Sequence, residues 1–440
     1  MLMPVIDMRT DEGRGVFKQR LRTLRAASSS VGEYARTAGE IIERVRREGD
    51  AAIVAEMRRW TDPDFTADRI RVSGVEIDAA LDKIDSDLRV LLEKAIEHVR
   101  AYQAHILPKP IKPIEIDGAE LGLRFTPVER VGLTVPGGSA VLFSSIIMLA
   151  VPAQVAGVAR SRISVVNPPP YREAGEAARD ISPVVMATCK LLGIERVYRI
   201  GGPAAVAALA FGTETVEAVD LVVGPGHPVV AAAQGQVRGL IGTGDFYGAS
   251  EIVTVADASA NPKYIAADLI AQAEHNPGKC FLVTWSGEVI DRILNQIQAY
   301  LPQRRRRGAI EKALKEVSAA IHTADRAQAV EVANRLAPEH LNLAVADAHA
   351  MLGEIRHAGE VFLGDQTPVA AGDYWAGPSH TLPTDTTARF ASGVSVYTFL
   401  KRSGTVCYPS GVDASTIEAI TRLAMEEGLD GHAESVRVRG

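Results

Sequence analysis

The stretch AQAEHNPGK, residues 271–279, places two polar side chains at the end of a helix-like run. Gln272 and His275 are three residues apart, so their side chains point the same way from the last helical turn. An imidazole is a good zinc ligand, and a glutamine carbonyl oxygen is a weaker, harder one. Two ligands do not hold a metal ion, so a metal site here needs donors from elsewhere in the chain. The competing interpretation is a surface pair at a helix end.

A second polar pair, Glu339 and His340, opens the strand-like run in LAPEHLNLAV. Imidazole titrates near neutrality and a carboxylate activates water, so this pair has the chemistry for two proton transfers. Neighbouring residues at the start of a strand point to opposite faces, and both face one cleft only if the chain bends, as Pro338 would allow. The competing interpretation is an exposed polar pair before a buried strand.

Two further polar segments lie towards the carboxyl end. Asp373 and His380 occur in TPVAAGDYWAGPSHTLPT, a loop dense in glycine and proline, and such loops on a rigid scaffold often carry function. Glu427 and His432 occur in the closing GLDGHAESVRVR, where a lone histidine is usually solvated. The chain has only 10 histidines, and four of them fall in these polar, turn-rich segments, which favours a shared site.

The composition is that of a soluble globular protein. The 440 residues are 47% hydrophobic and 23% charged, as in ordinary globular domains. The formal net charge of −6 argues against a nucleic-acid partner, which requires a basic surface. The N-terminus lacks the apolar segment of a signal peptide, and the most apolar stretch, IIMLAVPAQVAGVA, is too short for a membrane span. Three scattered cysteines fit a reducing compartment, so we expect a cytoplasmic protein.

The hydrophobic pattern changes along the chain. Residues 30–106 carry apolar residues at helical spacing, and Pro108, Pro110 and Pro113 then mark a linker. From about Arg130 short β-branched runs alternate with Ala-rich helices in two consecutive series, which predicts two sheets with covering helices. Glycine turns follow several of these strands, but none fits G-x-G-x-x-G, so alone they do not establish a dinucleotide site.

Several motifs, in order along nearly the whole chain, resemble those of the histidinol dehydrogenase family. They are RREGDAA, IRVSGVEIDAAL, PVERVGLTVPGG, MLAVPAQVAGV, DLIAQAEH, LAPEHL, GDYWAGPSHTLPT and EGLDGHAESVRVR. The implied fold class is α/β, with two consecutive incomplete Rossmann-like domains, a helical N-terminal region and a small C-terminal tail domain. The expected boundaries are 1–110 for the helical region, 111–130 plus 245–376 for the domain with metal and catalytic residues, 131–244 for the NAD side, and 377–440 for the C-terminal segment.

The resemblance implies a zinc-dependent, NAD-linked enzyme of histidine biosynthesis. It would oxidise L-histidinol to L-histidine through an aldehyde, with two NAD+ per turnover. His340 would be the general base towards the alcohol, and Glu339 would activate water to hydrate the aldehyde. One Zn2+ per subunit would be held by Gln272, His275, Asp373 and His432. The substrate would be bound by these four residues and His340, together with Ser250, His380 and Glu427.

The resemblance also implies an intertwined homodimer, because in the family the tail belongs to the partner subunit's site. Glu427 and His432 would then complete the site of the other subunit, and a monomer would have an incomplete zinc shell. Neither a nucleic acid nor a membrane is implied as a partner.

Three positions depart from the family's pattern, and all three belong to its nicotinamide cofactor site. Thr134 stands where tyrosine is common after VGL, Ala204 takes the glutamine position of the GGAQ turn, and His227 replaces the asparagine of the GPGN turn. Loss of a stacking ring and two amides removes contacts of about 1 kcal/mol each, or about fivefold in affinity apiece. The zinc and substrate positions all match the family's pattern. The departures therefore bear on the affinity for the cofactor, or on which cofactor is bound, and not on the zinc or the substrate.

Three other functions are compatible with parts of the sequence. A paralogue with the same zinc chemistry could oxidise another polar alcohol, which the altered cofactor turns permit and the retained Glu427 and His380 oppose. A zinc hydrolase with Glu339 as its base would lack the H-E-x-x-H motif. A binding protein that has lost the chemistry is opposed by the intact Glu339–His340 pair.

Overall fold

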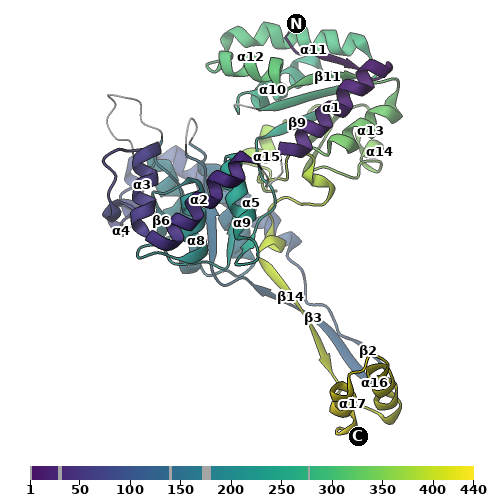
Figure 1. The fold of residues 1–440 in the computed structure, drawn as a ribbon. Helices are drawn as coiled ribbons and strands as arrows, with labels where there is room; N and C mark the ends of the chain where they lie inside the picture. The colour runs from purple at the N-terminus through teal and green to yellow at the C-terminus, as the bar shows by residue number, and fades with distance from the viewer. Residues whose placement is uncertain (1, 28–31, 138–140, 171–179, 276–277) are drawn as a thin grey trace.

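The computed structural model describes residues 2–27, 32–137, 141–170, 180–275 and 278–440. They form two α/β units and a long arm that ends in two helices (Figure 1). Gly138 of the PVERVGLTVPGG motif and residues 276–277 of AQAEHNPGK lie outside the described residues. Within the described ranges, no helix is both long enough and apolar enough to cross a bilayer.

A six-stranded parallel sheet forms one α/β unit, in the strand order β1-β11-β10-β9-β12-β13. The runs EIVTVA and KCFLVT are buried at every position, which is the pattern of parallel strands covered by helices on both faces. The strands are β1 (Val5–Asp7), β9 (Glu251–Ala256), β10 (Lys279–Thr284), β11 (Ala319–His322), β12 (His340–Ala344) and β13 (Glu360–Leu363).

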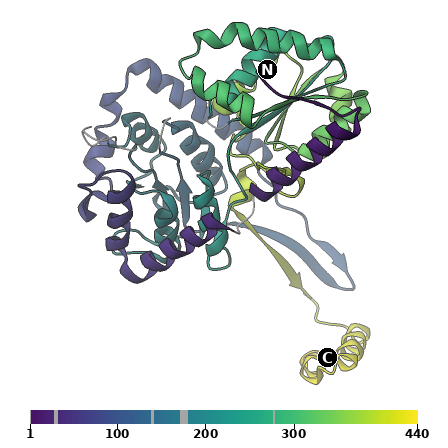
Figure 2. The same ribbon diagram turned by 45° about the horizontal axis from the view of Figure 1, so that its top comes forward.

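Helices cover both faces of the six-stranded sheet (Figure 2). They are α1 (Asp11–Ala27), α10 (Pro262–Ala273), α11 (Gly287–Tyr300), α12 (Arg307–Glu316), α13 (Arg326–Leu336) and α14 (Ala348–Leu352), and the short α15 (Ala370–Tyr374) follows β13. Ile265 and Ile290 belong to the core cluster that α10, α11 and α12 form on one face. Phe17 and Val330 belong to the cluster that α1, α13 and α14 form on the other face.

A five-stranded parallel sheet forms the second unit, in the order β6-β5-β4-β7-β8. Its strands are β4 (Val131–Thr134), β5 (Ile163–Val166), β6 (Arg196–Tyr198), β7 (Leu221–Val223) and β8 (Gly242–Thr243). One core cluster includes α4 (Gly74–Asp78), α5 (Ser86–Ile106), α6 (Phe143–Val155) and α7 (Pro183–Leu191). The opposite cluster includes α2 (Glu33–Glu48), α3 (Asp50–Trp60), α8 (Gly202–Phe211) and α9 (Pro228–Val237).

The two sheets share one topology. In each, the third, second, first, fourth and fifth strands of an α/β series lie side by side, and β1 adds an edge strand to the larger sheet. This is the doubly wound, Rossmann-like order, in which a crevice opens at the carboxyl ends of the two strands where the winding reverses. Those strands are β4 and β7 in one sheet and β9 and β12 in the other. The predicted α/β fold class is confirmed.

The arm is an antiparallel ribbon in the order β14-β3-β2 that projects away from both α/β units (Figures 1 and 2). It consists of β2 (Ile114–Ile116), β3 (Ala119–Pro127) and β14 (Leu400–Cys407), and it ends in α16 (Ala414–Glu426) and α17 (Asp430–Arg437). Apolar side chains on it are open to solvent: Val406 is 70% exposed, Leu423 69% and Val438 67%. A ribbon of this kind has too little core to be stable alone, and its apolar surface calls for a partner.

Two of the expected domain boundaries differ from the observed arrangement. Residues 5–7, within the expected helical region 1–110, pair as β1 with β11 of the six-stranded sheet. Residues 114–127, which fall entirely in the range 111–130 expected for the domain with metal and catalytic residues, contain β2 and β3 of the arm. A three-residue strand carries no periodic signal, and β3 pairs with a strand near the end of the chain, so neither pairing leaves a local trace in the sequence.

Candidate active site

Four strands of the six-stranded sheet begin with a polar residue. These are Glu251 in β9, Lys279 in β10, His340 in β12 and Glu360 in β13. The strands are parallel and their first residues are paired across the sheet, Lys279 with Glu251 and His340 with Glu360, so the four side chains gather at one end. The amino-terminal edge of this sheet is therefore the candidate site.

Ser250 connects two of the predicted site residues. Its hydroxyl accepts a hydrogen bond from Gln272 Nε2 (2.7 Å) and donates one to Glu339 Oε2 (2.6 Å). The same oxygen of Glu339 accepts a hydrogen bond from the backbone N–H of Glu251 (2.8 Å). Gln272 and Glu339 are both buried. The network fixes the carboxylate, and it turns the amide so that Oε1 of Gln272 is the atom left to bind a metal.

His340 is held from one side of its ring only. Its Nδ1–H donates to the backbone carbonyl of Glu251 (3.2 Å), which leaves Nε2 as the basic nitrogen. Nε2 is 4.0 Å from Asp373 Oδ1, and it is buried without a hydrogen-bond partner among the described residues. Glu339 and His340 both reach this edge because the chain bends before β12, where Ala337 has a left-handed backbone (φ 45°).

Burial sets the basicity of the carboxyl groups at this edge. It raises the pKa of Glu339 to about 7, although hydrogen bonds from Ser250 and the Glu251 backbone oppose the rise. It also raises the pKa of Glu360 to about 7, against the attraction of His340. A group with a pKa near the operating pH can both take up and return a proton, so Glu339 is suited to general base catalysis.

Lys279 lies between two buried carboxylates. Its Nζ is 3.3 Å from Glu251 Oε2 and also bonds Asp385 Oδ1, while the backbone N–H of Asp385 donates to Glu251 Oε1 (2.9 Å). Asp385 has a left-handed backbone (φ 54°), which is uncommon without glycine. The triad holds Glu251 in place, and the backbone of Glu251 in turn binds both Glu339 and His340.

Replacing Lys279 by Met is expected to lower the free energy of unfolding by about 3–5 kcal/mol at neutral pH, because two buried carboxylates then face each other without a cation. Urea denaturation measures the loss. Lys190→Met is the matched control, since Lys190 pairs with Asp78 at the surface and such pairs contribute below about 1 kcal/mol. Equal losses in the two variants would contradict the role of the triad.

The predicted zinc ligands come from the body of the protein, by which we mean its two α/β units, and from the arm. His275 follows α10, and its Nδ1–H donates to the carbonyl of Gln272 (3.2 Å), which is the usual support for a metal-binding histidine. With Asp373 of α15 these residues offer an amide oxygen, an imidazole and a carboxylate, a donor set that fits zinc with positions left open. His432 lies in α17 at the far end of the arm. The described part of the chain accordingly gathers no metal-binding group of three or more His, Cys, Asp or Glu side chains.

The remaining predicted substrate contacts are divided in the same way. His380 lies with its Nε2 3.1 Å from Ser144 Oγ in the first turn of α6, and burial lowers its pKa, which favours the neutral ring. Ser379 beside it donates to the carbonyl of Met148 (3.0 Å). These contacts dock the candidate site against α6, the helix that follows β4. Glu427, in contrast, is exposed at the end of α16 on the arm.

Two predicted cofactor positions flank the reversal point of the five-stranded sheet. Thr134 ends β4, and its hydroxyl donates to the carbonyl of Pro225 in the turn after β7 (3.3 Å). A Cβ on Gly224 would lie 2.3 Å from the carbonyl oxygen of Thr134, so only glycine allows this close approach. His227 is exposed in the same turn, with its ring edge-on to Tyr34 at 5.5 Å between centroids. The crevice beside β4 and β7 is where doubly wound sheets bind dinucleotides.

The third predicted cofactor position, Ala204, is buried in the first turns of α8 and is 1% exposed. It packs in the core cluster of α2, α3, α8 and α9. A methyl group there offers no polar contact, so a part in cofactor binding for Ala204 stays a prediction, as it does for Thr134 and His227.

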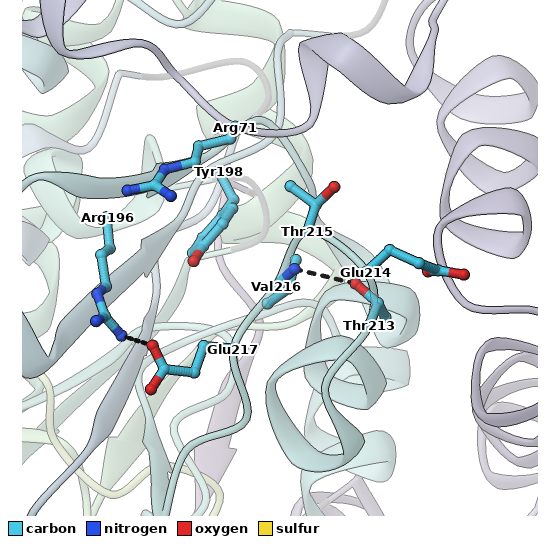
Figure 3. A pocket seen from close by; sticks show the side chains of 8 residues that line it. All are labelled: Arg71, Arg196, Tyr198, Thr213, Glu214, Thr215, Val216 and Glu217. Carbon is cyan, nitrogen blue, oxygen red and sulfur yellow. Dashed lines mark hydrogen bonds and ion pairs between the residues drawn. The ribbon is translucent and has the colours of Figure 1, made fainter.

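A hollow of about 350 Å³ lies elsewhere on the five-stranded unit, between β6 and the loop before β7 (Figure 3). Three of its charged side chains are already engaged: Arg196 pairs with Glu217, and Glu214 accepts from the backbone N–H of Asp50 (2.8 Å). None of the predicted site residues lines it. Its full lining is Arg71, Arg196, Tyr198, Thr213, Glu214, Thr215, Val216 and Glu217.

Sequence reasoning missed the charged residues that support the site, namely Glu251, Lys279, Glu360 and Asp385. A signal for three of them exists in the sequence. Glu251 and Lys279 each begin a strand that is buried along its whole length, and Glu360 begins the partly buried β13. A charged residue at the start of such an apolar run is costly unless it is paired or functional. Asp385 carries no such signal, because it lies in a loop far along the chain from its partner.

Comparisons with known proteins agree with the motifs. A family model described as histidinol dehydrogenase matches residues 24–440. This chain belongs to the histidinol dehydrogenase family. A histidinol dehydrogenase from Synechococcus sp. is 42% identical over 91% of both chains. One from Pseudomonas syringae pv. syringae is 44% identical over 91% of this chain and 88% of its own. The crystal structure of histidinol dehydrogenase from Elizabethkingia anophelis has a TM-score of 0.88 at 30% identity, covering 100% of this chain and 98% of that one.

Membership of the histidinol dehydrogenase family settles the broad class of activity. The protein is an NAD-dependent oxidoreductase of the kind that serves histidine biosynthesis. The match covers both α/β units and the arm, so the candidate site and the elements that position it all belong to the shared fold.

Proposed function

We propose that this protein oxidises L-histidinol to L-histidine by two successive two-electron steps, through the aldehyde, with zinc and two NAD+. The observation that carries the proposal is the basic Nε2 of His340, which is buried without a partner 4.0 Å from Asp373. A buried nitrogen without a hydrogen-bond partner is unfavourable in the resting protein. It is favourable where a substrate hydroxyl supplies the missing hydrogen bond.

The first step removes a hydroxyl proton and a hydride from the alcohol carbon. His340 Nε2 accepts the proton, and the carbonyl of Glu251 keeps Nδ1 protonated, so the ring enters the step as a neutral base. Bound zinc would fix and polarise the substrate through Gln272, His275, Asp373 and His432. NAD+ bound at the crevice beside β4 and β7 would take one hydride in each step.

The second step begins with hydration of the aldehyde. Glu339 takes a proton from water, whose oxygen bonds to the aldehyde carbon, while the protonated His340 returns its proton to the aldehyde oxygen, and the product is a gem-diol. Ser250 and the Glu251 backbone hold the carboxylate for this purpose. His340 then accepts a hydroxyl proton of the gem-diol as the second hydride leaves, and the product is the carboxylic acid. Four electrons are removed in total and two NAD+ are reduced.

The pKa of Glu339 predicts how the aldehyde step depends on pH. Since the base must be deprotonated and burial raises its pKa to about 7, the rate of L-histidinal oxidation is expected to rise with pH through this region and level off above it. Glu339→Gln should lose the aldehyde step by a factor of about 10²–10⁴ and lose this pH dependence. Stopped-flow measurement of NADH from L-histidinal tests both; an unchanged profile in Glu339→Gln would assign the pH dependence to another group.

We further propose an intertwined, cytoplasmic homodimer in which the arm of each subunit completes the site of the other. Support comes from the position of Glu427 and His432 on exposed helices at the end of the arm, remote from Gln272, His275 and Asp373. The exposed Leu423 and Val438 give these helices an apolar surface to pack on a partner. A reducing compartment fits the free Cys189, Cys280 and Cys407.

The experiment that tests the proposed function measures stoichiometry. Zinc-loaded protein is incubated with L-histidinol and NAD+, and NADH and histidine are both quantified. We expect two NADH per histidine, and loss of both products after chelation of the metal. Absence of NADH from an intact, zinc-loaded dimer would refute L-histidinol as the substrate and direct the search to another polar alcohol or cofactor.

A further inference from the structure

Glu360 is an acidic residue in the candidate site to which the proposed chemistry gives no role. It begins β13, and its Cα is paired in register with that of His340 in the neighbouring parallel strand. Its backbone N–H donates to the carbonyl of Glu339 (2.9 Å). Paired residues of adjacent strands project from the same face of a sheet, so the Glu360 carboxylate stands beside the His340 imidazole.

One oxygen of the Glu360 carboxylate, Oε2, is enclosed by the protein and has no hydrogen-bond partner among the described residues. A Cβ on Gly372 would lie 2.9 Å from this oxygen, which places the carboxylate against the backbone of α15 one residue before Asp373. Glu360 as a whole is only partly buried, so it forms part of the wall of the site and is not sealed in the core.

The charges around Glu360 favour a group that brings hydrogen-bond donors. Glu339 and Asp373 lie 3.6 Å and 4.0 Å from the two ring nitrogens of His340, and Glu360 begins the strand paired beside it. The carboxylates of Glu251 and Asp385, in contrast, are already balanced by Lys279. A buried acceptor without a partner is rare in folded proteins and calls for a specific explanation. An amino group, protonated or bound to a metal, has N–H donors suited to a carboxylate.

We propose that the Glu360 carboxylate is a specificity-determining group that accepts a hydrogen bond from the amino group of the substrate. This inference rests on the proposed oxidation of an amino alcohol at the same site. It assigns Glu360 to the part of the substrate away from the reacting carbon. Loss of such a contact weakens substrate and transition-state binding alike, so it raises KM and leaves kcat nearly unchanged.

Binding measurements with paired ligands isolate the amino group. Calorimetry on the zinc-loaded dimer without NAD+ compares L-histidinol with 3-(imidazol-4-yl)propan-1-ol, which lacks the amino group. Glu360→Gln is expected to bind L-histidinol about tenfold more weakly and to bind the analogue as the wild type does. Glu360→Ala should lose at least as much. In Glu311→Gln, an exposed surface control on α12, neither affinity should change.

The same variants separate recognition from a structural role. A structural role would weaken both ligands equally and lower the melting temperature, whereas the proposed role raises KM for L-histidinol about tenfold with kcat within about twofold. Unchanged affinity of Glu360→Gln for L-histidinol, or an equal loss for both ligands, would overturn the proposal.

A second ligand pair distinguishes failure of this inference from failure of the proposed function. Histamine and 4-ethylimidazole differ by an amino group and need not be turned over. If the wild type does not oxidise L-histidinol, the proposed function fails. Glu360 is then judged on this pair alone: a preference for histamine that Glu360→Gln abolishes supports its role, and no preference in the wild type overturns it.

Discussion

Replacing His340 by Asn is expected to lower kcat for L-histidinol oxidation by a factor of about 10²–10⁴, the usual contribution of a positioned general base. The asparagine amide can still donate to the carbonyl of Glu251, as Nδ1 of His340 does, so the fold should be retained. What is lost is the basic Nε2 at the buried position facing Asp373. Steady-state NADH formation under saturating substrate measures the change.

The pH profile of this variant provides a second test. Without the imidazole, hydroxide from solvent must remove the alcohol proton, so the residual rate in His340→Asn should keep rising with pH. His349→Asn is the matched control, because His349 is exposed on α14 and its loss should leave both kcat and the profile unchanged. A kcat within about threefold of the wild type in His340→Asn would exclude His340 as the general base.

The residues that do the proposed chemistry were predictable from the sequence in type, but their common location was not. Gln272 and His275 were expected on one side of a helix end, and the structure places them at the end of α10, joined by the Gln272 carbonyl. Glu339 and His340 required a bend that a sequence permits without specifying; the left-handed Ala337 provides it.

General rules for this topology point to the wrong edge of the larger sheet. In doubly wound sheets ligands bind at the carboxyl ends of the strands, and the predicted cofactor residues Thr134 and His227 of the five-stranded sheet stand at that end. In the six-stranded sheet Glu251, His340 and Glu360 stand at the amino-terminal edge instead. Periodicity cannot show this, because a buried parallel strand is apolar along its whole length and gives no sign of which end faces a site.

Supporting charges are still harder to predict than the site residues. Lys279 is fixed by Glu251 in the adjacent strand and by Asp385 in a distant loop. A single sequence shows each as an isolated charge, which usually means a solvated one. Only the assembled sheet brings them together, and only then does the role of Glu251 as the common anchor of Glu339 and His340 become visible.

The second large expected effect on activity comes from a substitution in the arm. His432→Ala alone is expected to abolish activity, because it would remove one of the four proposed zinc ligands. Mixing it with His340→Asn should restore activity if each arm serves the partner subunit. A hybrid dimer then has one site with both substitutions and one site with neither. A random equimolar mixture contains about one half hybrids, so about one quarter of the wild-type activity is expected.

The outcome depends only on which subunit supplies His432, which makes the test sharp. If the arm folded back onto its own body, every subunit in the mixture would carry one defect and no activity would return. Mixing His340→Asn with Glu339→Gln is the matched control: both residues lie in the body, so each site in the hybrid remains defective and recovery is not expected. Recovery in the first mixture but not in the second can arise only from an exchanged arm, and it would also explain why Leu423 and Val438 are open to solvent in a single subunit.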